Sequence, residues 1–280
     1  MKILKNITVF TMVMLLSVST VLEAREKNIS NFSSSASNLV DSTGTFDGNK
    51  IYADVANNGL FLDYHVSGDS ALEWPKGTGV HSIFQSALWM GATVNGSIRT
   101  IVGDYTQDMG PGPWGGDPLA AVHRIYKVEK SMLASPLDFA DFQEWPVEFG
   151  APWVDVDGDG VYTPLPGGTD HPEFLGDQVL WFVSNDGDPA YKLNFGTSPM
   201  NVEIQTTMFG FDRPDVFGDM VFLKQLVINK GSDDLVDTYM GLWSDPDLGY
   251  AGDDFVGCDV ALGMGYVWND GDDSQYSTLD

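Results

Sequence analysis

The β-strand pattern of this chain is clearest in one stretch, Ala87-Leu-Trp-Met-Gly-Ala-Thr-Val-Asn-Gly-Ser-Ile-Arg-Thr-Ile-Val102. Two β-prone runs, 87–94 and 97–102, flank the pair Asn95-Gly96. A two-residue turn of type I′ requires a positive φ at both central residues, and an Asn-Gly pair adopts it readily. The sequence therefore predicts an antiparallel hairpin over this stretch.

Short β-prone runs separated by turn residues continue on both sides of this hairpin. They cover residues 50–55, 60–64, 122–128, 179–183, 202–211, 220–229, 238–243 and 262–267. One short helix is expected from Ser135, a favoured N-cap that Pro136 and Asp138 follow, and Pro146 ends it. Roughly ten strands and one helix predict a mainly β fold, an antiparallel, jelly-roll-like β-sandwich with long loops.

The N-terminus has the composition of a secretory signal. Lys2 and Lys5 begin it, a mainly apolar run covers 7–21, and Ala24 ends a cleavage site. An uncleaved membrane anchor is the alternative, although the run is short for a spanning helix. We expect residues 1–24 to be a signal peptide, 25–45 a flexible polar lead-in and 46–280 the β-sandwich domain. Because the chain stops just after a strand and an acidic turn, we expect a truncated domain or one module of a longer protein.

The charge of the chain narrows the classes of partner. Among 280 residues, 40 are acidic and 14 basic, which gives a formal net charge of −26. Such a field repels nucleic acid and anionic membrane surfaces, so neither is expected as a partner. Eight Trp and 12% aromatic residues argue against disorder. Cys258 is the only cysteine, so the chain has no intramolecular disulfide.

The segment Asp155-Val-Asp157-Gly-Asp159-Gly160-Val161 has the spacing of a calcium-binding loop. Positions 1, 3 and 5 of an EF-hand loop supply side-chain oxygens and position 7 a backbone carbonyl; here these are Asp155, Asp157, Asp159 and Val161. Gly160 stands at position 6, where the chain needs a positive φ. The sequence therefore predicts a Ca²⁺ site. The alternative is an Asp/Gly-rich turn with solvated carboxylates.

The other ligands of this site must come from outside the seven-residue core of the loop. Pro166 occupies position 12 in place of the usual glutamate, and Ca²⁺ takes six to eight oxygens. Asp170, Glu173 and Asp177 follow closely. Asp170 is the favoured ligand, and Asp177 is predicted beside it.

A second acidic stretch follows Trp243 and carries a weaker prediction of metal binding. Its carboxylates belong to Asp245, Asp247, Asp253, Asp254 and Asp259. Their spacing matches no known loop, and the alternative is a solvated loop whose Asp side chains cap its own backbone. The acidic runs 185–188 and 269–273 are interpreted as plain turns.

Sequence signals for catalysis are weak. The chain has no zinc spacing among its histidines, no Gly-x-Ser-x-Gly elbow and no phosphate-binding loop. The histidines are His65, His81, His123 and His171. Glu73, Glu144 and Glu148 lie beside aromatic residues, which keeps glycoside hydrolysis open. The sequence argues against an enzyme without excluding one.

The tryptophans suggest an alternative function. Sugar-binding sandwiches stack pyranose rings on exposed indoles. Trp74, Trp114 and Trp145 lie in Pro- and Gly-rich surroundings and are expected to be exposed. Trp89, Trp181 and Trp243 lie in predicted strands and are expected in the core.

Six motifs occur together in this chain. They are Leu72-Glu-Trp-Pro-Lys-Gly77, Leu88-Trp-Met-Gly-Ala92 with Val94-Asn-Gly96, Gly150-Ala-Pro-Trp-Val-Asp-Val-Asp-Gly-Asp-Gly160, Gly176-Asp-Gln178, Phe209-Gly-Phe-Asp-Arg213 and Trp243-Ser-Asp-Pro-Asp-Leu-Gly249. From about Ile51 onward the chain resembles the front region of large secreted or surface proteins that carry a type IX secretion C-terminal sorting domain. The resemblance implies export across both membranes of a Gram-negative cell and no particular chemistry. This chain has no sorting domain, so we expect either a truncated chain or a different export route.

These observations together predict an extracellular or cell-surface protein. We expect a non-catalytic β-sandwich stabilised by calcium in its Asp-rich loops, with an adhesive or structural role and with an extracellular glycan or a surface protein as its partner. The mature chain is not expected to insert into a membrane. The alternative is a carbohydrate-binding or polysaccharide-degrading module.

Overall fold

The computed structural model describes residues 6–13, 43–68, 70–269 and 271. In this part of the chain the fold is mainly β, every strand pairing is antiparallel, and the single α-helix is α2 (Ala140–Gln143). The predicted fold class is confirmed.

The largest sheet has six strands and is here called the central sheet. Its order is β1 (Asn6–Val13), β15 (Phe222–Asn229), β14 (Val202–Gly210), β13 (Gln178–Asn185) and β10 (Tyr126–Glu129). β9 (Gly110–Pro111) pairs with the Asn185 end of β13. All eight residues of β13 are buried, which fits a strand that is covered on both faces.

Two four-stranded sheets cover one face of the central sheet. The first has the order β16 (Val236–Asp245), β7 (Gln85–Val94) and β4 (Leu60–Leu62), with β8 (Ser97–Val102) paired to β7. The second has the order β2 (Thr43–Phe46), β3 (Tyr52–Ala56), β5 (Leu72–Glu73) and β6 (His81–Ile83). Two separate ribbons complete the strands: β11 (Trp153–Val154) with β12 (His171–Pro172), and β17 (Asp254–Asp259) with β18 (Met264–Asn269).

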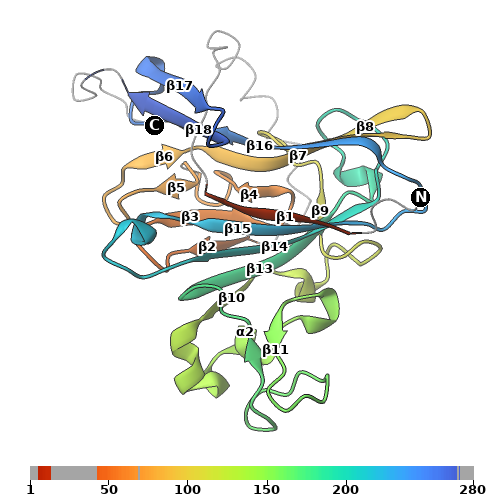
Figure 1. Cartoon of the computed structure of the whole chain (residues 1–280), viewed down its shortest axis with the longest axis vertical. Helices are drawn as coiled ribbons and strands as arrows, with labels where there is room; N and C mark the ends of the chain where they lie inside the picture. Colours follow the sequence, from red (N-terminus) through yellow and green to blue (C-terminus); the bar gives the residue numbers. More distant parts are fainter. Residues whose placement is uncertain (1–5, 14–42, 69, 270, 272–280) are drawn as a thin grey trace.

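The core has two layers of contact, one on each face of the central sheet. On one face, Leu180 and Phe182 pack against side chains of the four-stranded sheets such as Val55 and Phe61. On the other face, Trp181 and its neighbours pack under residues 130–175, here called the cover segment. The cover segment lies at the bottom of Figure 1, where α2 and β11 are labelled.

Short 3₁₀ helices account for most of the helical residues. They are η1 (Ala121–His123), η2 (Lys130–Ala134), η3 (Pro136–Asp138), η4 (Val147–Phe149), η5 (Pro189–Tyr191), η6 (Val216–Asp219) and η7 (Ala251–Asp253).

The predicted hairpin around Asn95-Gly96 is confirmed, and two other predictions need correction. Asn95 and Gly96 have φ of 51° and 78°, as a type I′ turn requires, and they join β7 to β8. The helix predicted from Ser135 is split into η3 and α2, because Phe139 between them is extended (φ −124°, ψ 111°). Residues 254–259, expected in an acidic loop, form β17 instead.

The N-terminal predictions fall largely outside the described residues. Of the predicted signal peptide, residues 6–13 form β1 and pair with β15, and the rest is not described. Of the predicted lead-in, only residues 43–45 are described, and they belong to β2. Cleavage of a signal peptide therefore stays a prediction. No helix among the described residues is long and apolar enough to cross a membrane.

Candidate metal centre

The Asp-rich stretch lies in a loop that a two-stranded ribbon closes. β11 and β12 pair through Trp153 with Pro172 and Val154 with His171, so residues 155–170 form the connection between them. We call this connection the acidic loop. Because its two ends are paired, its carboxylates are brought back toward one another despite their separation in sequence.

Two aromatic side chains anchor the acidic loop to the cover segment. The rings of Trp153 and Tyr162 meet edge to face, with centroids 5.5 Å apart. The Tyr162 hydroxyl donates to the carbonyl oxygen of Phe142 in α2 at 2.6 Å. Burial, with a smaller contribution from the Asp170 charge, raises the pKa of Tyr162, so this hydroxyl stays protonated as a donor. Both rings pack against the core on the far face of the central sheet.

Asp155 organises the turn at the start of the acidic loop. Its two carboxylate oxygens accept hydrogen bonds from the backbone N–H groups of Gly158 (2.7 Å) and Gly160 (2.9 Å). Gly158 and Gly160 have φ of 81° and 77°, in the region that glycine adopts at the lowest cost. A Cβ at either position would meet open space, so it is the backbone conformation that requires glycine there.

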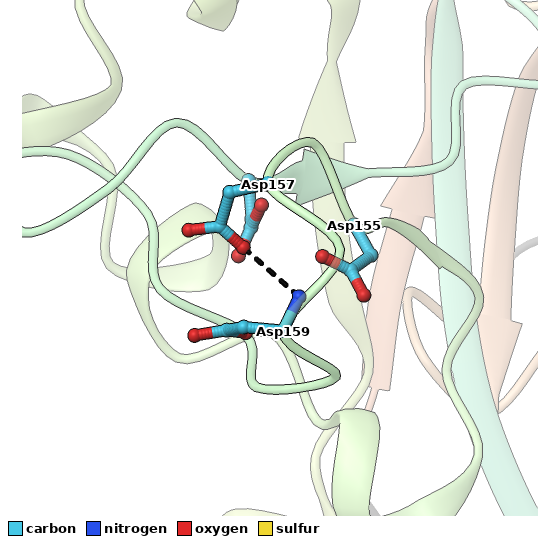
Figure 2. Close-up of side chains that lie close together, drawn as sticks. Asp155, Asp157 and Asp159 are labelled. Atoms are coloured by element: carbon cyan, nitrogen blue, oxygen red, sulfur yellow. Dashed lines mark hydrogen bonds between the residues drawn. The ribbon is translucent and has the colours of Figure 1, made fainter.

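Asp157 and Asp159 continue the turn from exposed positions. Asp157 accepts a hydrogen bond from the N–H of Asp159 at 3.2 Å, and Asp159 accepts one from the N–H of Val161 at 2.7 Å. Figure 2 shows the three carboxylates of Asp155, Asp157 and Asp159 gathered around this turn, with the first of these bonds dashed.

Asp170 closes the acidic loop from its far end. Its side chain is 2% exposed, and its oxygens accept from the N–H groups of Val156 (2.8 Å) and Thr163 (2.9 Å). One carboxylate thus joins the first and later parts of the loop.

The structure brings Asp155, Asp157, Asp159 and Asp170 together as predicted. One carboxylate oxygen from each lies within 4.8 Å of one from every other. Two oxygens on opposite sides of a Ca²⁺ ion are about 4.6–5.2 Å apart, since each Ca–O bond is about 2.3–2.6 Å long. This cluster, here called the Asp cluster, has the dimensions of a site for a metal ion.

The Asp cluster is negative and has no basic partner in the described part of the chain. None of the ion pairs between described residues includes any of its four carboxylates. Oxygen-only ligands are those that hard cations such as Ca²⁺ and Mg²⁺ prefer.

The other predicted ligands of this site have different positions. Asp177 lies outside the Asp cluster, at the start of the central sheet, where its carboxylate accepts from the N–H of Asp212 at 2.9 Å. The backbone of Glu173 bonds to the carbonyl of Pro152. The carbonyl of Val161 accepts from the Thr163 hydroxyl at 3.3 Å, and its predicted role as a ligand stays a prediction.

The structure does not gather the second acidic stretch into a comparable group within the described residues. Asp245 and Asp254 accept from Tyr105 and from the N–H of Leu248, and Asp259 caps the turn after β17. Asp247 is buried, and both carboxylate oxygens of Asp253 are shielded from solvent. The weaker prediction of a metal site here stays a prediction.

The four histidines are separated, and each ring is bonded to its own neighbour. The closest partner atoms are the Asp63 carboxylate for His65 and backbone carbonyls for His81, His123 and His171. Of the carboxylates considered for glycoside hydrolysis, Glu73 accepts from the N–H of Gly79 and Glu144 pairs with Arg124 at 2.9 Å.

The observed burial of the tryptophan side chains differs in part from the prediction. Trp145 was expected at the surface and is 2% exposed, within the core under the cover segment. Trp74 and Trp114 are exposed as predicted, and Trp181 is buried as predicted. Trp89 and Trp243, expected in the core, are only partly buried and stack on each other with centroids 5.9 Å apart.

One feature that the sequence did not identify is a pocket between residues 110–118 and 185–191. The Gly- and Pro-rich composition of the first segment was the available signal, but the pairing of β9 with β13 is what creates the pocket. Comparison of the chain with protein-family models, with curated proteins and with solved structures found no significant match.

Proposed function

We propose that the Asp cluster binds one calcium ion and that this ion stabilises an exported, non-catalytic β-sandwich protein with an adhesive or structural role. The observation that supports this most strongly is the convergence of four carboxylates from both ends of the acidic loop, within 4.8 Å of one another. The buried Asp170 holds the loop through the N–H groups of Val156 and Thr163, and it also brings a fourth carboxylate to the three exposed ones.

The ion would stabilise the fold by neutralising charge. Carboxylates at this separation repel one another, and a divalent cation between them converts the repulsion into attraction. The acidic loop is tied to α2 and to the core through Tyr162 and Trp153, so its order affects the packing on the central sheet. Calcium at a hundredfold excess over Kd would add about 2.7 kcal/mol to the free energy of unfolding.

Calcium is favoured over magnesium by the donor set. Three of the four carboxylates come from one exposed turn and the fourth from the buried Asp170, and Ca²⁺ accepts six to eight oxygens in variable geometry. Mg²⁺ demands near-ideal octahedral geometry at shorter distances and usually keeps several waters. The predicted export supports the same choice, because calcium is plentiful outside cells.

Thermal melting of the full chain tests this proposal. The protein is stripped with EDTA, and its melting temperature is measured with CaCl₂, with MgCl₂ and with NaCl at equal ionic strength. We expect a clear rise with CaCl₂, a smaller one with MgCl₂ and none with NaCl. A melting temperature that CaCl₂ leaves unchanged would refute the proposed calcium site.

The exported location is tested separately. We expect a protein recovered from outside the cell to begin at Arg25, the residue after the predicted cleavage site. An N-terminus at Met1 on exported protein would contradict the predicted signal peptide.

A further inference from the structure

The pocket between residues 110–118 and 185–191 has the size of a small-ligand site. Its volume is about 340 Å³, at the lower end of the range of roughly 300–1,000 Å³ that is usual for ligand pockets. Its lining residues lie beside β9, at the Asn185 end of β13. Trp114 and Tyr191 supply aromatic walls, and Asn185 and Asp188 supply polar groups.

Trp114 is exposed and yet held in place. Its side chain is 43% exposed, while its indole N–H donates to the Asn201 side chain at 3.2 Å. Its backbone N–H donates to the carboxylate of Glu203 at 2.9 Å. Gly187 lies directly against the indole, because a Cβ there would stand 2.6 Å from the ring atoms Cδ1 and Nε1. A large aromatic side chain that is already fixed loses little entropy when a ligand stacks on it.

The glycine-rich side of the pocket is also rigid. Gly110 lies against the ring of Tyr191, where a Cβ would come within 2.9 Å. Gly112 and Gly116 pack against the ring of His123, which is buried and whose Nδ1 donates to the Asp117 carbonyl at 2.6 Å. The segment is therefore wrapped closely around a buried ring, and its glycines keep the space in front of Trp114 and Tyr191 clear.

The polar groups of the pocket indicate what it can accept. One oxygen of Asp188 accepts from the N–H of Ala190 at 2.8 Å, and the other makes no hydrogen bond to the described residues. The residues that line the pocket include no Lys or Arg, and the chain carries a net charge of −26. Phosphates, nucleotides and acidic sugars are therefore disfavoured.

We propose that this pocket binds a neutral carbohydrate, one or two sugar rings long, that stacks on Trp114 and donates a hydroxyl hydrogen bond to Asp188. An indole offers the flat apolar face that the C–H side of a pyranose contacts, and a carboxylate is a strong acceptor for hydroxyl groups. The pocket shares no residue with the Asp cluster, so this inference stands apart from the calcium proposal.

The chain offers a matched control for the stacking residue. Trp74 is 45% exposed, and its indole N–H also bonds to a side chain, that of Asp219, at 3.1 Å. Asp219 ends η6, three residues before β15 begins near the Gln178 end of β13, whereas the pocket lies at the Asn185 end. These ends are about 23 Å apart along the strand. Trp74→Ala therefore removes a comparable indole far from the pocket.

Calorimetric titration of the full chain tests the proposal with defined probes. The probes are maltose, cellobiose, lactose, xylobiose, mannobiose and N,N′-diacetylchitobiose, with choline as a cationic probe. We expect at least one sugar to bind wild-type protein and Trp74→Ala equally. We expect Trp114→Ala to weaken that binding by roughly tenfold or more, because truncating an aromatic anchor is among the costliest changes in a binding site.

Gly187→Ala supplies a second variant that keeps the tryptophan. The added methyl group must displace the indole, so we expect sugar binding to weaken although Trp114 is present. This variant decides the test if Trp114→Ala fails to fold by circular dichroism. Absence of binding by all six sugars, binding that survives both pocket variants, or binding of choline alone would overturn the proposal.

Discussion

Two groups of neighbouring carboxylates in this protein differ in how their negative charge is balanced. Asp108 and Asp186 are fully buried, and the buried Nζ of Lys192 lies between them, 2.8 Å from one carboxylate and 3.9 Å from the other. The Asp cluster places four carboxylates together with no basic residue of the described chain among them. The first group is balanced by the ammonium of Lys192. The second has no such internal cation among the described residues and could be balanced by a metal ion from solution.

The difference follows from where the two groups lie. The Lys192 group joins β8, η5 and the segment before β14 inside the molecule, and its ammonium also donates to the carbonyl of Thr100 at 2.5 Å. A fixed internal cation suits a dry site because it cannot be lost. The Asp cluster lies at the surface, where three of its four residues are exposed and an ion can enter and leave.

The largest effect is expected from removing the internal cation. Lys192→Met keeps the length and apolar stem of the side chain but leaves Asp108 and Asp186 buried without a counter-charge. Breaking a buried ion pair in this way costs about 3–5 kcal/mol. Chemical denaturation, compared with wild type, measures this loss.

Lys50→Met is the matched control for that variant. Lys50 pairs with Asp219 at the same distance of 2.8 Å, but its side chain is 42% exposed. A surface pair of this kind contributes about 0–1 kcal/mol. Equal losses from Lys192→Met and Lys50→Met would contradict the role assigned to the internal lysine.

A smaller effect is expected from removing one charge of the Asp cluster. Asp157→Asn keeps an oxygen that can accept from the N–H of Asp159, so the metal-free loop should retain its turn. With one negative charge fewer, we expect calcium affinity to fall about tenfold, which is about 1.4 kcal/mol of calcium-dependent stability. Melting curves with EDTA and with CaCl₂ separate the two contributions.

Asp234→Asn removes an exposed carboxylate outside the Asp cluster and should leave the calcium response unchanged. If Asp157→Asn responded to calcium as fully as Asp234→Asn does, the Asp cluster would not be the binding site.

The smallest effect is expected in how the stability contributed by Asp186 depends on pH. Burial raises the pKa of Asp186 above its ordinary value of 3.8, despite backbone hydrogen bonds from Val202 and Met200 and the nearby Lys192 charge. Between 3.8 and this raised pKa the folded protein holds a proton that the unfolded chain releases. The contribution of Asp186 to stability therefore falls as pH rises through that window and is constant above it.

The variant Asp186→Asn isolates this dependence. Denaturation of metal-free protein at a series of acidic pH values measures the free energy of unfolding. In wild type the contribution of Asp186 to it should decline as pH rises, and this decline should be reduced in the variant. Parallel curves for the two proteins would show that Asp186 does not titrate with a raised pKa.

Local chemistry made part of the fold predictable from sequence. The Asn95-Gly96 hairpin depends on backbone preferences of two adjacent residues, and the long apolar runs over β13 and β14 depend on burial alone. The short strands β5 and β6 were not predicted, because their pairing is set by neighbouring strands. The helix at Ser135 was overestimated, because Phe139 adopts an extended conformation and packs on the core.

The candidate site, too, was predictable from sequence only where local spacing determines it. The spacing of Asp155, Asp157 and Asp159 predicted that their carboxylates would lie together, and Asp170 was the favoured additional ligand. Asp177 has an equally acidic side chain, but the strand pairing directs it to the N–H of Asp212. The pocket at Trp114 depends on segments about 75 residues apart that meet only when β9 pairs with β13, and sequence spacing does not reveal such a contact.

Anomalous diffraction from crystals of the full chain grown with CaCl₂ tests the proposed calcium site most directly. We expect one calcium peak within the acidic loop, about 2.3–2.6 Å from oxygens of Asp155, Asp157, Asp159 and Asp170. A map with no peak there, and with the four carboxylates turned apart into solvent, would contradict it.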